Sequence, residues 1–216
     1  MPSTDPTLDT LRPRLQAHLQ ALEHGLLERE TATRLLLLAA VAGEHVLLIG
    51  PPGTAKSALV SSLARLLSAR YFEYLLTRFS EPNELLGPID LHAFREGVYR
   101  RRSEQMLPVA EVAFLDEIFD GRDMLLRSAL NVLQEREVKQ GGSIAKGKIE
   151  CAIMTTNRYI SEILEQSRET LLAFIDRIAF IAFVPRGFAE PAHLGRVLRR
   201  SVARPSVLIG KRSEEH

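Results

Sequence analysis

Eight consecutive residues have the types and order expected of a loop that binds phosphate: Gly50, Pro51, Pro52, Gly53, Thr54, Ala55, Lys56 and Ser57. An apolar run precedes this loop and an apolar-patterned helix follows it, which is the context that a phosphate loop requires. The first N–H groups of that helix have no intrahelical partner, and the helix dipole adds positive charge there. Lys56 would bring a positive charge to the β- and γ-phosphates, and the hydroxyl of Ser57 is placed to bind Mg²⁺. The loop therefore predicts a nucleotide site.

Ala55 is the one departure of this loop from the pattern G-x-x-x-x-G-K-[ST], which has a glycine before the lysine. Where that position requires a positive φ, alanine adds strain of about 1 kcal/mol. We expect a negative φ at Ala55, because Lys56, Ser57 and both prolines are in place. The alternative for the whole segment is a strand–turn–helix corner that binds no ligand.

Two adjacent carboxylates, Asp116 and Glu117, follow the apolar run 111–115. At the carboxyl end of a buried strand they fit the second half of a nucleotide site. Asp116 would hold Mg²⁺, directly or through water, and Glu117 would orient and polarise the attacking water. The alternative is a solvated acidic pair that opens the next turn.

Asn157 ends another predicted strand, over residues 150–155. A polar side chain there can hydrogen-bond the attacking water or the γ-phosphate. Asparagine is also a common turn residue, so its presence alone does not distinguish these roles.

Apolar runs and helical periodicity predict the elements that position these residues. Strands are expected over residues 45–49, 71–76, 111–115, 150–155 and 178–184. Helices are expected over residues 14–27, 30–42, 58–67, 123–136, 161–172 and 191–203, the last of them basic. Alternating strands and helices predict an α/β fold with a mainly parallel sheet and helices on both faces.

Local signals predict several turns and ends. Hairpins are expected over residues 89–101, around Glu96 and Gly97, and over residues 138–148, around a Gly-Gly pair. Ser80 is expected to cap a short helix, and His45 to lie half-exposed at the start of its strand. Residues 1–13 are expected to form a mobile arm and residues 204–216 a disordered tail.

The composition is ordinary for a soluble globular protein: 216 residues, 45% hydrophobic and 25% charged, with a net charge of +1. This charge gives no overall electrostatic case for binding nucleic acid. The single cysteine, Cys151, excludes an internal disulfide and fits a reducing cytoplasm. No signal peptide is visible, and the longest apolar run, residues 35–42, is far shorter than the roughly 18 residues of a membrane span. We therefore expect a cytoplasmic protein.

Taken together, these motifs resemble an AAA+ ATPase of the MoxR family, with the RavA subgroup as the nearest pattern. The matching stretches are residues 25–29, 48–53, 72–80, 114–118, 131–136 and 176–177. The resemblance runs from about residue 15 to residue 184. It implies a P-loop NTPase fold of the AAA+ type with a central five-stranded sheet, and it implies ATP and Mg²⁺ as cofactors.

The resemblance also implies roles for single residues. Residues 50–57 resemble the Walker A loop, and Asp116 and Glu117 resemble Walker B, with Glu117 activating water. Asn157 is similar to sensor 1. Arg177 resembles the arginine finger that enters the site of a neighbouring subunit and ties hydrolysis to assembly. The alternative for Arg177 is a helix-capping or surface salt-bridge arginine.

By the same resemblance, residues 14–185 form the ATPase core, and residues 79–108 form an insert and hairpin that project toward a central pore. Residues 186–216 are too few for the usual helical lid, so we expect that lid to be truncated or absent. The sensor 2 arginine of relatives has no assigned counterpart among Arg196, Arg199 and Arg200.

The resemblance implies a ring, by analogy a hexamer, that hydrolyses ATP to remodel a client protein in a chaperone-like way. It also implies a partner with a von Willebrand factor A domain. One alternative is a nucleotide-dependent binding module with little turnover, because the lid is missing. A second is a nucleic-acid motor, which salt-sensitive DNA binding at arginines 95, 100–102 or 196–200 would favour; we expect no nucleic-acid partner and no membrane span.

Overall fold

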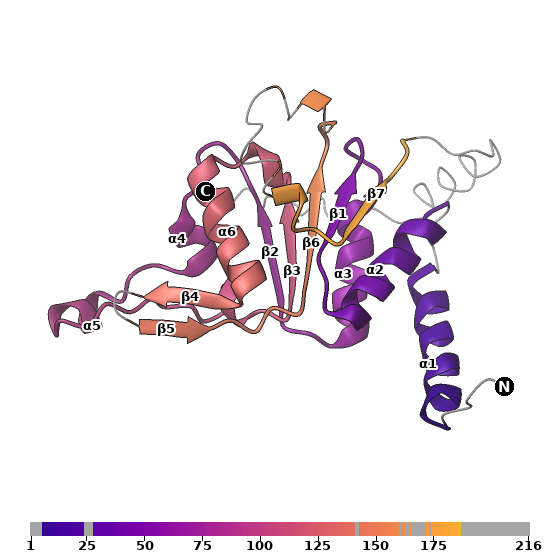
Figure 1. Ribbon diagram of the computed structural model, residues 1–216, viewed down its shortest axis with the longest axis horizontal. Helices are drawn as coiled ribbons and strands as arrows, with labels where there is room; N and C mark the ends of the chain where they lie inside the picture. Colours follow the sequence, from indigo (N-terminus) through magenta and orange to yellow (C-terminus); the bar gives the residue numbers. More distant parts are fainter. Residues whose placement is uncertain are drawn as a thin grey trace, which may run out of the picture. The chain divides into compact units, whose positions relative to one another are not determined.

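In the part of the chain that the structure describes, five parallel strands form the central sheet, in the order β2-β3-β6-β1-β7 (Figure 1). They are β1 (Val46–Ile49), β2 (Tyr71–Leu75), β3 (Val112–Asp116), β6 (Cys151–Thr156) and β7 (Phe180–Phe183). This computed structural model describes residues 6–23, 28–140, 143–159, 161, 162, 165, 172 and 174–186, without the side chains of residues 6–10, 139, 140 and 143. The predicted α/β fold with a five-stranded parallel sheet is confirmed.

Helices cover both faces of this sheet because its central strands are buried on both sides. In β1, Val46 and Leu48 belong to one core, and Leu47 and Ile49 belong to the other, as expected when side chains alternate along a strand. The first core includes side chains of α1 (Pro6–Glu23), α2 (Glu30–Ala42) and α3 (Lys56–Leu67). The second includes α4 (Pro82–Leu86) and α6 (Asp123–Glu135).

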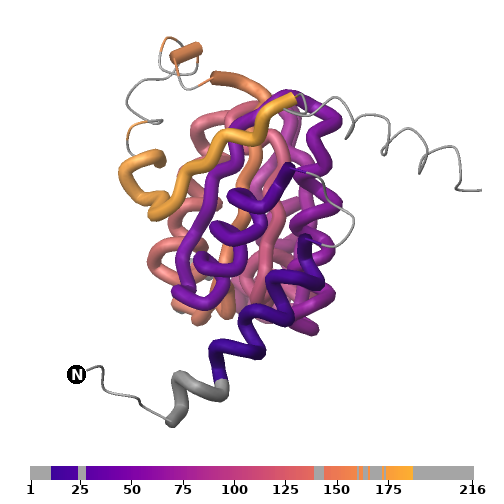
Figure 2. Tube along the Cα trace, turned by 90° about the vertical axis from the view of Figure 1, so that its right-hand side faces the viewer, coloured from indigo at the N-terminus to yellow at the C-terminus, as the bar shows by residue number. Residues whose placement is uncertain are grey.

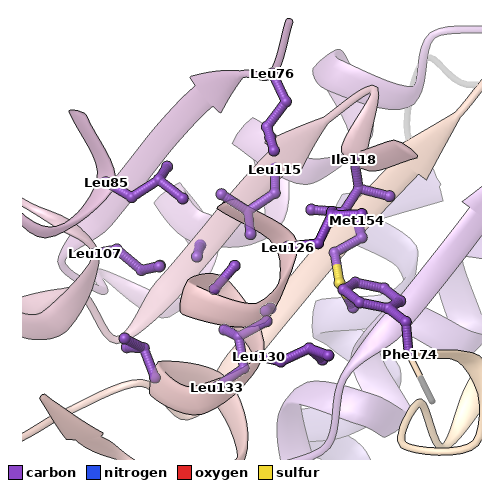
Figure 3. Packing of buried hydrophobic residues seen from close by; sticks show 14 of the residues in the cluster. Leu76, Leu85, Leu107, Leu115, Ile118, Leu126, Leu130, Leu133, Met154 and Phe174 are labelled. Atoms are coloured by element: carbon purple, nitrogen blue, oxygen red, sulfur yellow. The ribbon is translucent and has the colours of Figure 1, made fainter. Parts of the chain in front are cut away.

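The second core is built around the apolar face of α6. Leu126, Leu130 and Leu133 of this helix lie near Leu115 of β3 and Met154 of β6 (Figure 3). The core also includes Phe174, whose ring meets that of Phe119 edge to face at 5.3 Å. This packing holds α6 across the two strands that end in the candidate site residues.

The N-terminal segment differs from the prediction. Helix α1 begins at Pro6, so residues 6–13 do not form the predicted arm, and residues 1–5 lie outside the described residues. Proline is well suited to the first position of a helix, where its missing N–H is not needed, and the polar composition concealed this start. Figure 2 looks onto the end of the sheet where α1 and α2 lie, with α2 packed against β7.

The predicted hairpin over residues 89–101 is wrong. The segment forms α5 (Leu91–Arg95), joined only by an isolated antiparallel bridge between Ile89 and Arg101. Asp90 accounts for the difference, because its carboxylate caps the helix by accepting from the N–H groups of His92 and Ala93. The predicted hairpin around the Gly-Gly pair does form, from β4 (Glu137–Gln140) and β5 (Ser143–Lys146).

The cap of α4 is also not the predicted one. Glu81 is the N-cap residue and forms a capping box with Glu84. The hydroxyl of Ser80 instead accepts from the N–H of Thr77 at 3.0 Å and lies 3.0 Å from the hydroxyl of Tyr74. Ser80 thus closes the turn after β2.

Two short 3₁₀ helices, η1 (Leu107–Val109) and η2 (Ile118–Asp120), flank β3.

His45 is buried, with 8% of its surface exposed, and not half-exposed as predicted. Its Nδ1 accepts from the N–H of Ala152 at 3.2 Å, so Nε2 carries the proton and donates to the carbonyl of Leu133 at 2.9 Å. Burial lowers the pKa of His45. The neutral ring therefore links the end of α6 to β6 through these two hydrogen bonds. The sequence around residue 45 does not reveal either of these partners.

The C-terminal predictions are only partly covered. The helix predicted over residues 161–172 is helical at residues 161, 162, 165 and 172, which are its described residues. The chain divides into one unit of residues 1–186 and a second of residues 187–216. The predicted basic helix and tail lie in that second unit, outside the described residues.

Candidate nucleotide site

The phosphate loop joins the carboxyl end of β1 to the start of α3, as the sequence predicts. Gly50 is required by packing, because a Cβ there would lie 2.3 Å from the carbonyl oxygen of Val184. Gly53 has a φ of 78°, in the left-handed region that favours glycine. The hydroxyl of Thr54 donates to the carbonyl of Pro51 at 3.0 Å and closes the loop on itself.

Ala55 corrects the expectation of a negative φ. It is the N-cap residue of α3 and has φ 64° and ψ 21°, in the left-handed region. The conformation costs about 1 kcal/mol for a residue with a Cβ. Glu117 (φ 51°) and Glu28 (φ 55°) share this backbone conformation. Strained backbone of this kind persists where the surrounding structure holds it, and it is common at functional sites.

Lys56 lies at the first position of α3 with only 7% of its surface exposed. Its ammonium group donates to the carbonyls of Gly50 and Pro51, the second at 3.3 Å. Burial lowers the pKa of Lys56, and the charges of Glu117 and Asp116 oppose that shift. The lysine and the two carboxylates therefore act on one another across the same site.

Asp116 ends β3, and Glu117 follows it in the turn to η2. The Glu117 carboxylate accepts from the backbone N–H of Asn157 at 2.9 Å. Burial, and then the negative charge of Asp116, raise the pKa of Glu117, while the Asn157 hydrogen bond and the charge of Lys56 lower it. A carboxylate with a raised pKa is better suited to accept a proton from water.

Thr155 is a site residue that the sequence prediction missed. It is fully buried on β6. Its hydroxyl donates to the carboxylate of Asp116 and accepts from the backbone N–H of Glu117 at 3.3 Å. The parallel pairing of Leu115 with Met154 brings Thr155 beside Asp116. Its place in the sequence, two residues before Asn157 and near the end of a predicted strand, could have indicated Thr155 as a site residue. That inference requires knowing that β6 lies next to β3 in the sheet.

Asn157 and Arg177 are placed differently from each other. Asn157 reaches Glu117 through its backbone N–H, and the side chain that the prediction emphasised has no part in that hydrogen bond. Arg177 is exposed, and its N–H donates to the carbonyl of Phe174 at 3.2 Å. Among the described residues, no hydrogen bond or ion pair joins Arg177 to the phosphate loop or to the carboxylates.

The donor set fits a magnesium ion. Magnesium is usually bound by one or two carboxylates together with substrate phosphates and water. The hydroxyl of the exposed Ser57 and the carboxylate of Asp116 are oxygen ligands of this kind. Among the described residues there is no cluster of three or more acidic, histidine or cysteine side chains that could hold a metal ion.

A family model matches most of the chain. Its description is a MoxR domain in the MoxR-vWA-beta-propeller ternary systems, and it matches residues 13–204. The chain belongs to the MoxR family. This assignment confirms the MoxR-family AAA+ resemblance drawn from the motifs, whereas the RavA subgroup stays a prediction.

The sequence relatives of this MoxR-family chain are longer proteins. The uncharacterised protein MJ0079 of Methanocaldococcus jannaschii is 33% identical over 187 residues, which are 86% of this chain and 47% of the relative. Chaperone MoxR1 of Mycobacterium tuberculosis is 27% identical over 135 residues, 59% of this chain and 35% of that protein. The chain thus spans about half the length of the archaeal relative.

Solved structures show that the fold is shared with AAA+ proteins. A proposed ATPase from Cytophaga hutchinsonii matches with a TM-score of 0.62 at 17% identity, over 92% of this chain and 60% of that one. The Hsp104–ADP complex of S. cerevisiae matches with a TM-score of 0.60 at 16% identity, over 89% of this chain and 40% of that one.

Proposed function

We propose that this MoxR-family protein binds and hydrolyses ATP with Mg²⁺. One observation carries the proposal: β1 and β3 both pair in parallel with β6, so the phosphate loop with its buried Lys56 and the carboxylates of Asp116 and Glu117 follow strand ends at the same edge of the sheet. A phosphate loop opposite a paired carboxylate is the arrangement that phosphoryl transfer to water requires.

Each side chain has a defined task in this proposal. Lys56 exchanges its carbonyl partners for phosphate oxygens, and the N–H groups at the start of α3 bind the same anion. Ser57 and Asp116 would hold Mg²⁺, which would neutralise charge on the phosphates. Glu117, held by Asn157, accepts a proton from the attacking water. Asn157 serves through its backbone, and its side chain remains available to water or the γ-phosphate.

We further propose a ring oligomer, by analogy a hexamer, in which the exposed Arg177 enters the site of the neighbouring subunit. The family description names systems that contain vWA domains, which supports a vWA-domain partner. The name of Chaperone MoxR1 supports a chaperone-like task on a client protein. Within a core over residues 14–185, residues 79–108 would form the insert that projects toward the central pore. We also propose that the protein belongs to the RavA-like subgroup and that it is located in the cytoplasm.

None of the described helices has the length and apolar character needed to cross a membrane.

The first experiment is ATP turnover over a series of protein concentrations, with light scattering on the same samples. A specific rate that rises as the oligomer forms supports a ring motor with an arginine supplied in trans. Tight Mg-ATP binding without turnover at any concentration would favour the nucleotide-dependent binding module instead. Absence of binding would contradict the nucleotide site itself.

A further inference from the structure

Arg29 is a buried cation in contact with the phosphate loop, and only 7% of its surface is exposed. Its guanidinium donates from Nε to the carbonyl of Thr54 at 3.2 Å and from Nη2 to the carbonyl of Pro185 at 3.1 Å. Nη1 donates to the carbonyl of Glu28 at 2.8 Å. Burying a charge is costly unless it is hydrogen-bonded, so these carbonyls fix the position of the guanidinium.

The contact with Thr54 orients the peptide that opens α3. The Thr54 carbonyl and the Ala55 N–H share one planar trans peptide and point in opposite directions. By holding the carbonyl, Arg29 turns the Ala55 N–H away from itself. Ala55 is the N-cap residue of α3, so this N–H lies at the helix N-terminus, where an anion binds. The same contact supports the left-handed conformation of Ala55.

The contact with Pro185 ties the loop to the chain that leaves β7. Nε and Nη2 share one edge of the planar guanidinium, so that edge holds the Thr54 and Pro185 carbonyls side by side. Gly50, at the start of the loop, touches the carbonyl of Val184 so closely that no Cβ would fit. The N–H of Val184 donates to the carbonyl of Ile49 at 2.7 Å. Both ends of the loop are therefore fastened to the step from Val184 to Pro185.

We propose that Arg29 is a positioning residue, whose hydrogen bonds hold the phosphate loop against residues 184–186, the segment that follows β7. Nucleotide on the loop and the conformation of residues 184–186 then act on each other, because coupling between two sites is reciprocal. Arg29 acts through the loop and does not touch the reacting atoms. The assignment rests on the proposed ATP site, which supplies the anion that the loop holds.

The test compares Arg29→Lys with the control Arg34→Lys. Arg29 is the N-cap residue of α2, and Arg34 lies within that helix with a side chain that is 68% exposed. Lysine keeps the charge but has no planar fork to hold two carbonyls at once. Titration calorimetry with Mg-ADP should give a Kd about 10-fold weaker for Arg29→Lys, the size expected for one charged hydrogen bond. Arg34→Lys should bind like the parent protein.

Hydrogen exchange separates positioning from general damage to the fold. In the parent, Mg-ADP should slow amide exchange in residues 50–57 and 178–186 over the same range of nucleotide concentrations. In Arg29→Lys at saturating Mg-ADP, the loop should still be protected, while residues 178–186 should no longer respond. A merely structural role would raise exchange throughout the protein, with and without nucleotide.

The outcomes are distinct. Equal Mg-ADP affinity, or an unchanged response of residues 178–186 in Arg29→Lys, would overturn the role given to Arg29. If Arg29→Lys does not fold by circular dichroism, the parent alone decides: protection of the loop without protection of residues 178–186 overturns the coupling. A parent protein that binds neither Mg-ATP nor Mg-ADP contradicts the proposed function and the role of Arg29 together.

Discussion

At the scale of single residues, the candidate site depends on charges held close together in a partly buried space. Lys56 is stabilised in its charged form by Asp116 and Glu117, and Glu117 is stabilised in its ionised form by Lys56 and Asn157. Burial opposes both charges. Removing one member of such a group leaves the others poorly compensated, so substitutions here should change function strongly.

Lys56→Ala should abolish nucleotide binding, because it removes the cation that meets the phosphates. Glu117→Gln should bind ATP normally and stall, since the amide cannot accept the proton of the attacking water. Calorimetry with Mg-ATP and a phosphate-release assay measure the two effects. Parent-like hydrolysis by Glu117→Gln would show that Glu117 is not the base.

Thr155→Val should retain nucleotide affinity but lower kcat by roughly 10-fold, because both carboxylate residues lose the hydroxyl that orients them. Thr155→Ser restores the hydroxyl and is the matched control, with turnover near that of the parent. Steady-state kinetics over a range of Mg²⁺ concentrations measure the effect. A Thr155→Val enzyme with full kcat would exclude a positioning role for this hydroxyl.

At the scale of elements, His45 shows how the sheet and α6 are joined. The ring bridges the carbonyl of Leu133 and the N–H of Ala152, and it must be neutral to accept at Nδ1. Its pKa in the folded state is lowered from the ordinary value of 6.5. The unfolded chain therefore binds more protons near and below that pH, so the contribution of His45 is complete above pH 6.5 and is lost as the pH falls.

His45→Asn should lower the free energy of unfolding at pH 8 by about 1–3 kcal/mol, because buried partners lose their hydrogen bonds. The variant should also lose part of the decline in stability below pH 6.5. Urea unfolding at a series of pH values measures both effects. His92→Asn, at a side chain that is 86% exposed, is the control and should change the free energy of unfolding at pH 8 by no more than about 0.5 kcal/mol. An unaltered pH profile in His45→Asn would contradict the neutral, buried role of this ring.

At the scale of the whole molecule, the proposed function assigns the cation that stabilises the transition state to a neighbouring subunit. Arg177 is exposed, and within the described part of the chain no ion pair or hydrogen bond joins its side chain to the site of its own subunit, which suits the proposed role between subunits. Assembly and hydrolysis would then depend on each other.

Arg177→Ala should leave ATP binding intact and reduce turnover by about 10³-fold, the size typical of an arginine finger. Mixing Arg177→Ala with Glu117→Gln should restore turnover that neither variant has alone. In the mixed ring, a subunit with an intact Glu117 can receive the arginine of its Glu117→Gln neighbour. Unchanged turnover of Arg177→Ala in a confirmed oligomer, or a mixture with no recovery, would remove Arg177 from this role.

The sequence by itself determined the residues of the phosphate loop, the pair Asp116 and Glu117, and where along the chain the five strands of the sheet occur, because these depend on local pattern. The tertiary structure decided what lies beside them. It set the strand order, which places Thr155 and Asn157 of the β6 end against the two carboxylates, and it buried His45. It also imposed a positive φ on Ala55 and placed Arg29 between Thr54 and Pro185. Those features depend on contacts between residues far apart in the chain, which no local pattern encodes.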